Sequence, residues 1–198
     1  MKIKKSVHVA EQIAFSSLLF DSLFGLVLFF SMDSFLDIKD PAHFIFYLFS
    51  TIILVHWWLI FKSVDDIHGK EVNNSLIDLV LGIGYVIFLE YVVLYAKEFD
   101  YLMATKFLLA VFLLDLIWAL LWRYVGKWYA RNKTHIGEME SELDIDIRLS
   151  LLMVVLLGVT LWLGQYLNAW QFVVVFVVEY LFYMFLTFKY QIIDIDLF

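Results

Sequence analysis

The sequence contains no cysteine, a single proline and few charged residues, and each shortage narrows what the chain can be. Without cysteine it forms no disulfide and no thiolate metal site, and it gives no clue to redox compartment. Charged residues make up 18% of the 198 residues, below the share of about 25% that soluble domains carry. The net charge of −7 offers no basic surface for nucleic acid, so we expect no nucleic-acid partner.

Apolar residues are abundant instead: they form 63% of the chain, and the mean hydropathy is +0.84. A helix that crosses the lipid hydrocarbon needs about 17–25 such residues. Six windows meet this need, at about 13–31, 43–62, 76–96, 103–124, 149–167 and 170–188. The first contains Asp21 and lacks a small-residue cleavage pattern, so we expect it to remain in the mature protein. The sequence therefore predicts an all-α, polytopic protein with six transmembrane helices in a lipid bilayer, one domain over 1–198.

The basic residues predict how this protein is oriented. Eleven lysines and arginines fall on the side of the N-terminus, and only Lys39, Lys97 and Lys106 fall on the other side. Cytoplasmic loops are the ones enriched in Lys and Arg. We therefore expect an integral protein of a cell membrane with both termini in the cytoplasm.

One connection, 126–148, is much longer than the others and is predicted to be a cytoplasmic linker. Its last part, from Leu143 to Leu149, alternates apolar and charged residues, and so does the C-terminal stretch 192–198. Alternation with a period of two is typical of a strand with one buried face. The pattern predicts that these two stretches pair as a small ribbon.

Four acidic residues lie well inside predicted helices: Asp21, Glu90, Asp115 and Glu179. A carboxylate in mid-membrane costs from about 2.5 kcal/mol upward, so such residues usually face a bundle interior or a watery cavity. No lysine or arginine lies at a comparable depth. We interpret the four as ion-binding or proton-binding residues. The alternative is that each is protonated and hydrogen-bonded to a neighbouring helix.

The sequence around these acids recurs. Asp21 and Asp115 are each followed, at the same offsets, by an aromatic, a small residue and leucine, and Glu90 and Glu179 are each followed by tyrosine. Two anchors in the same order predict duplication of a three-helix unit, over 1–100 and 101–198. Because three is odd, the repeat would be inverted across the membrane, as in many secondary transporters with midplane sites.

Helical spacing places the four acids on polar stripes that we expect to face one another at the bundle centre, with Tyr183 beside Glu179. Such a site would attract a metal ion, a monovalent cation or protons. Oxygen ligands suit Ca²⁺, Mg²⁺ or Mn²⁺. The sequence singles out no particular metal or cofactor.

A second polar group surrounds the end of the second predicted helix. His56 is either a satisfied histidine of the bundle or a proton relay beside the acids. Beyond it, a carboxylate and histidine cluster marks the predicted cytoplasmic mouth: Asp65, Asp66, His68 and Glu71. A solvated loop is the alternative to a metal site there. The cluster lacks the motifs of membrane prenyltransferases and zinc proteases, so we expect no enzyme.

Two resemblances concern the first two helices. The matching residues are Phe20, Asp21, Phe24, Trp57, Trp58, Lys62, Asp65 and Asp66. This pattern resembles the low-temperature-requirement A family of membrane proteins, from which Ser63 and Val64 depart. The first helix also resembles that of the six-helix bacterial relatives of the lysosomal potassium channel, although Phe20 stands where they carry serine. The second resemblance implies an oligomeric, potassium-type cation channel, and the first implies no definite function.

Three hypotheses follow from the sequence. The first is a transporter or exchanger that moves a cation or protons through a central carboxylate-lined site. The second is a cation channel built as a homo-oligomer, with pore-facing residues on its first helix. The third is a non-transporting membrane sensor or assembly protein whose acids are structural.

Overall fold

The computed structural model describes residues 21–29, 35, 38, 40–68, 76–129 and 136–190, with side chains for 21–29, 35, 38, 40–60, 80–124 and 143–190. Residues 21–29 are helical, and five longer helices follow: α2 (Pro41–His68), α3 (Leu76–Lys97), α4 (Tyr101–Tyr129), α5 (Ile136–Leu163) and α6 (Ala169–Lys189). All five are long and apolar enough to cross a membrane. The chain is therefore a multi-pass membrane protein.

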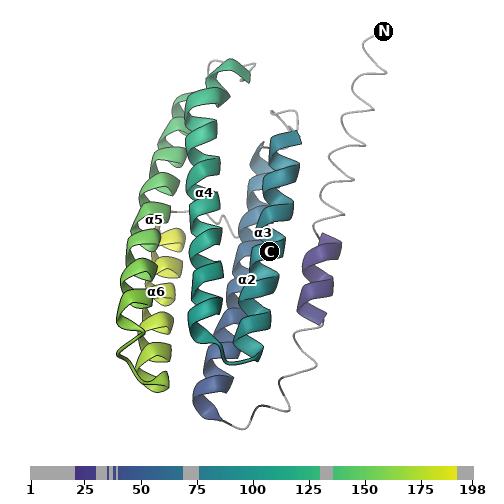
Figure 1. The fold of residues 1–198 in the computed structure, drawn as a ribbon. Helices are drawn as coiled ribbons and strands as arrows, with labels where there is room; N and C mark the ends of the chain where they lie inside the picture. The colour runs from purple at the N-terminus through teal and green to yellow at the C-terminus, as the bar shows by residue number, and fades with distance from the viewer. Residues whose placement is uncertain are drawn as a thin grey trace.

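The five long helices pack as a closed ring. α2 contacts α3, α3 contacts α4, α4 contacts α5, α5 contacts α6, and α6 returns to contact α2. Consecutive helices run in opposite directions and stand side by side (Figure 1). The helical segment 21–29 stands beside the ring (Figure 1), where Trp58 of α2 bonds to Asp21.

Polar caps start the three helices that begin at one end of the ring, which we call the capped end. The side chains of Asp40, Asp100 and Asn168 accept hydrogen bonds from backbone N–H groups three residues later. Each bond satisfies a donor that the first helical turn would otherwise leave unpaired. At Asn168 the cap is reciprocal, because the side chain of Gln171 accepts from the Asn168 backbone.

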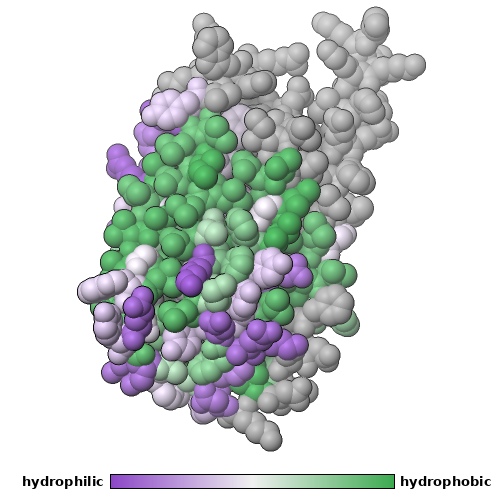
Figure 2. Space-filling model, in the orientation of Figure 1, coloured by the Kyte–Doolittle hydropathy of each residue, from purple (hydrophilic) through white to green (hydrophobic). Residues whose placement is uncertain are grey.

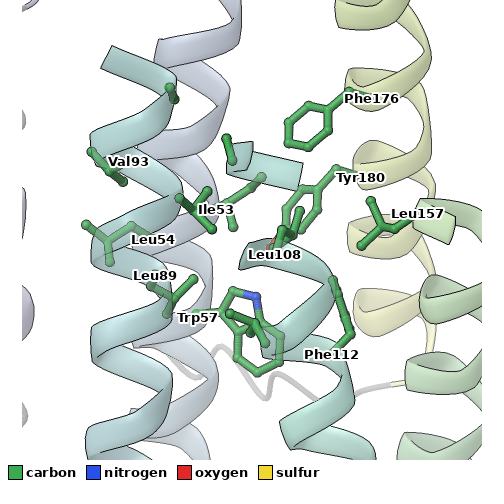
Figure 3. Packing of buried hydrophobic residues seen from close by; sticks show 14 of the residues in the cluster. Ile53, Leu54, Trp57, Leu89, Val93, Leu108, Phe112, Leu157, Phe176 and Tyr180 are labelled. Carbon is green, nitrogen blue, oxygen red and sulfur yellow. The ribbon is translucent and has the colours of Figure 1, made fainter. Parts of the chain in front are cut away.

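The interior of the ring is filled with large apolar side chains. The bulkiest fully buried ones are Tyr47, Phe46, Trp57, Phe112, Phe172, Phe176 and Tyr180. Trp57 packs near Phe112 and Leu89, while Phe176 and Tyr180 reach in from α6 toward Ile53 and Leu108 (Figure 3). Outward-facing positions are apolar too, and Figure 2 shows a broad apolar surface with hydrophilic residues gathered toward the capped end. A molecule that is apolar inside and outside needs lipid around it.

The structure agrees with five of the six predicted spans and corrects the predicted ribbon. Most of the first predicted span, 13–31, lies outside the described residues. The stretch from Leu143 to Leu149 is helical and belongs to α5, so the strand prediction there is wrong. The predicted linker 126–148 is also helical up to Tyr129 and again from Ile136. The helix of the membrane span continues through this stretch, and its hydrogen bonding outweighs the strand preference of the alternating apolar and charged residues. The stretch 192–198 lies outside the described residues.

Replacing either of two glycines, one in α5 and one in the turn after it, by alanine should change stability in opposite directions. A Cβ at Gly164, in the turn before α6, would lie 2.6 Å from Phe172 Cε2 and 2.9 Å from Leu102 Cδ2, whereas one at Gly158 would meet nothing within 4 Å. We expect Gly164→Ala to destabilise the protein by about 1–3 kcal/mol through overpacking. We expect Gly158→Ala to stabilise α5 by up to about 1 kcal/mol. Thermal unfolding in detergent measures both, and equal effects would contradict the packing.

Candidate functional site

Asp115 of α4 joins three neighbouring helices. The Tyr85 hydroxyl of α3 donates a hydrogen bond to Asp115 Oδ1 at 2.9 Å, and the Ser150 hydroxyl of α5 donates to Oδ2. The carboxyl group is partly buried between these helices. Both of its oxygens therefore have donors from the protein itself, as an acid inside a membrane requires.

His56 of α2 forms the second polar link. Its Nδ1 lies 2.8 Å from the Tyr180 hydroxyl of α6, and the His56 side chain is only 2% exposed. The ring also makes edge contacts with Tyr180 and Tyr183. The other ring nitrogen, Nε2, is buried and has no hydrogen-bond partner among the described residues. His56 thus keeps one position at which a proton can be gained or lost.

Tyr183 lies beside the second of these links. Its ring centroid is 5.6 Å from that of Tyr180 and 5.8 Å from that of His56. The resulting group contains at least one polar side chain from every helix of the ring. We call it the five-helix cluster: His56, Tyr85, Asp115, Ser150, Tyr180 and Tyr183.

Glu179 lies beside the cluster on α6, in the middle of the candidate span Ala169–Lys189. The buried Thr160 hydroxyl of α5 donates to Glu179 Oε1 at 2.5 Å. The second carboxyl oxygen, Oε2, is buried and has no partner among the described residues. Among the described residues, only one carboxyl oxygen of Glu179 therefore has a hydrogen-bond donor, whereas both oxygens of Asp115 have one.

The remaining two acids lie elsewhere. Asp21 accepts a hydrogen bond from the Trp58 indole N–H at 2.8 Å, at the side of the ring. Glu90 is exposed on the outer surface of α3, and it makes no hydrogen bond or ion pair within the described part of the chain. No three acidic or histidine side chains among the described residues lie close enough to hold a metal ion. The structure thus does not bring the four acids together in one central site.

The other sequence candidates are placed as follows. His56 and Tyr183 meet in the cluster, as members of one aromatic and polar group rather than beside all four acids. Asp65, Asp66 and His68 lie in the last turns of α2, and their side chains are outside the described residues. Glu71 lies outside them as well.

Sequence reasoning missed the partners of the acids. Ser150 and Thr160 are both fully buried on α5, the helix that carries no deep acid. They share a buried stripe with Met153 and Leu157, at spacings of three, four and three residues. This helical period was readable in the sequence. Two hydroxyls on one buried stripe could have indicated α5 as the donor helix.

The half of the ring toward the capped end is filled differently. There the ring of Phe46 packs against those of Phe172 and Phe176, with centroids 6.4 and 4.9 Å away. Of the buried hydroxyls in this half, Ser50, Thr51 and Thr105 donate to carbonyls of their own helices. Thr160 donates to Glu179. Phe46, Phe172 and Phe176 therefore form an apolar layer between the His56–Tyr180 link and the capped end.

Comparison with known proteins adds no relative. The chain matches no protein-family model, no curated protein and no solved structure. Its likeness to the low-temperature-requirement A family and to the channel relatives stays a prediction.

Substitutions of two fully buried threonines measure how much the hydrogen bond to Glu179 contributes to the free energy of unfolding. Thr160→Val removes the donor to Glu179 while keeping the side-chain shape, and leaves a buried carboxyl without a partner. We expect a loss of about 1–3 kcal/mol in the free energy of unfolding.

Thr105→Val is the matched control, because the Thr105 hydroxyl only donates to the Tyr101 carbonyl of its own helix. It should cost less than Thr160→Val, because it leaves no buried carboxyl group without a donor. Unfolding in mixed micelles measures both variants. Equal losses would show that the bond to Glu179 contributes nothing specific.

Proposed function

We propose that the protein moves protons across the membrane through the interior of the five-helix ring. The observation that carries this proposal is the five-helix cluster, in which a histidine, a carboxyl and several hydroxyls lie inside one bundle. These groups are the side chains that pass protons along hydrogen bonds. Ionisable groups inside a membrane usually mark such a path.

Protons fit the arrangement better than a metal cation does. The four acids are dispersed, and His56 bonds to a tyrosine rather than to a carboxylate. A divalent cation requires several oxygen ligands around one point, whereas a proton requires only a chain of donors and acceptors. Glu179, whose Oε2 is buried without a partner among the described residues, offers a further proton-exchanging carboxyl group on α6 near the middle of its span.

The apolar layer supplies the barrier that a transporter needs. Phe46, Phe172 and Phe176 separate the His56–Tyr180 link from the capped end. A transporter opens its site to one side at a time. Under this proposal, transport would require these rings to move.

The finer topology remains part of the proposal: six spans, both termini in the cytoplasm and an inverted three-helix repeat. One pair of contacts supports the repeat. Asp21 accepts a hydrogen bond from Trp58, 37 residues later, and Asp115 accepts one from Ser150, 35 residues later. In both halves, the aspartate of the first helix would bond to the second helix. Glu90 and Glu179 do not share an environment in this way.

A second candidate is a non-transporting membrane protein whose acids are structural. It is favoured by the separate hydrogen-bonding partners of Asp21, Asp115 and Glu179. The channel hypothesis gains less support, because Asp21 bonds to Trp58 within the same chain instead of standing free to line a shared pore.

Proton flux into liposomes separates the two candidates. Purified protein is reconstituted with a pH-sensitive dye inside, and a pH step is applied across the membrane. We expect flux above that of protein-free liposomes, reduced by about tenfold or more in Asp115→Asn and His56→Gln, since each loses a proton-exchanging group.

The control for this experiment is Thr105→Val, which alters the ring interior outside the cluster and should leave the flux unchanged. Flux equal to that of protein-free liposomes, or equal in all variants, would reject proton transport and leave the structural candidate. Equal reconstitution of each variant is checked by labelling a single added cysteine, Tyr166→Cys, in the exposed turn before α6.

A further inference from the structure

The outward face of α3 carries a carboxyl group at a depth where α5 and α6 carry apolar side chains. Glu90 lies near the middle of the candidate span Val80–Lys97 and is exposed on the ring's outer surface. The exposed neighbours on the same face are Val80, Ile83, Ile87, Tyr91 and Leu94. We call these residues, with Glu90, the Glu90 face.

The outward faces of α5 and α6 differ at this depth. α5 presents Leu151, Val155 and Val159, while α6 presents Val174, Val178 and Leu181. A carboxyl group in contact with lipid chains loses the hydrogen bonds that it would make to water, and this loss is unfavourable. The Glu90 face is therefore the outward face that gains most from being covered by protein.

Tyr91 supplies the complementary group beside Glu90. Its side chain is 40% exposed, and its ring stacks on Phe107 of α4 with centroids 4.8 Å apart. The Tyr91 hydroxyl makes no hydrogen bond within the described part of the chain. Neighbouring positions on one helix do not face each other, so Tyr91 does not satisfy its own Glu90. A donor and an acceptor thus stand next to each other on the surface, and neither is paired within the described part of the chain.

We propose that the Glu90 face is the contact between two copies of this chain. In a two-fold dimer each patch meets the same patch on its partner, so a donor and an acceptor on one patch can pair reciprocally. The Tyr91 hydroxyl of each copy donates to Glu90 of the other. Two copies with the same orientation in one membrane hold these residues at the same depth. An unrelated helix would need a matching donor and acceptor of its own at that depth, whereas a second copy of this chain already carries both.

The absence of cysteine makes the interface directly testable. Single cysteines are placed on the Glu90 face, as Ile87→Cys and Leu94→Cys, and on outward positions of α5 and α6, as Val155→Cys and Val178→Cys. Oxidation in membrane vesicles should yield disulfide-linked dimers several-fold more for the first pair than for the second. Equal yields at all four positions would overturn the proposal.

The hydrogen bond is tested in the Ile87→Cys protein. Tyr91→Phe removes only the hydroxyl and keeps the ring that stacks on Phe107, so the fold is retained. We expect it to lower the yield of linked dimer several-fold, as Glu90→Leu does, while Glu90→Gln keeps an acceptor and most of the yield. An unchanged yield in Tyr91→Phe would overturn the proposed pairing. None of these measurements depends on proton flux, so the dimer and the transport proposal can fail separately.

Discussion

A polar side chain inside a membrane has no water to bond to, and this constraint arranges the whole ring. Apolar helices gain little from contacting one another rather than lipid, so polar bonds and close packing must choose their partners and register. Each of the five helix contacts in the ring carries such a bond. The pairs are His43 with the end of α3, Tyr85 with Asp115, Asp115 with Ser150, Thr160 with Glu179, and His56 with Tyr180.

These bonds explain why the acids tolerate their positions without basic partners. Asp115 receives two hydroxyl donors from different helices, and Glu179 receives one. The same arrangement gives the proposed path its members, because a hydrogen-bonded carboxyl, imidazole or phenol can still exchange a proton. The bonds that hold the ring together and the groups proposed to move protons are therefore largely the same.

The sequence predicted the helices well because length and hydropathy determine them directly. The span expected at 170–188 is found as α6, Ala169–Lys189, and that expected at 76–96 as α3, Leu76–Lys97. The prediction failed at Leu143 to Leu149, where a short alternating pattern was outweighed by the helix that continues from it. Local periodicity is weak in a segment of seven residues.

The site was harder to predict because depth alone does not say which way a side chain points. Asp115 and Glu90 look alike in the sequence, each an acid in a long apolar run, yet one faces two hydroxyls and the other faces outward. Their difference depends on which neighbours the helix contacts, and hydropathy carries no information on that. His56 was a candidate because of its residue type, but its partner, Tyr180, lies 124 positions away.

The most direct test of the ring is the coupling between Tyr85 and Asp115. Tyr85→Phe, Asp115→Leu and the double variant are unfolded in mixed micelles, and the two single losses are compared with the combined one. The structure predicts a coupling free energy of about 0.6–1.7 kcal/mol, the size found for hydrogen bonds between membrane helices. Additive losses would mean that the two side chains do not interact, and would contradict the arrangement of α3 and α4 on which the ring depends.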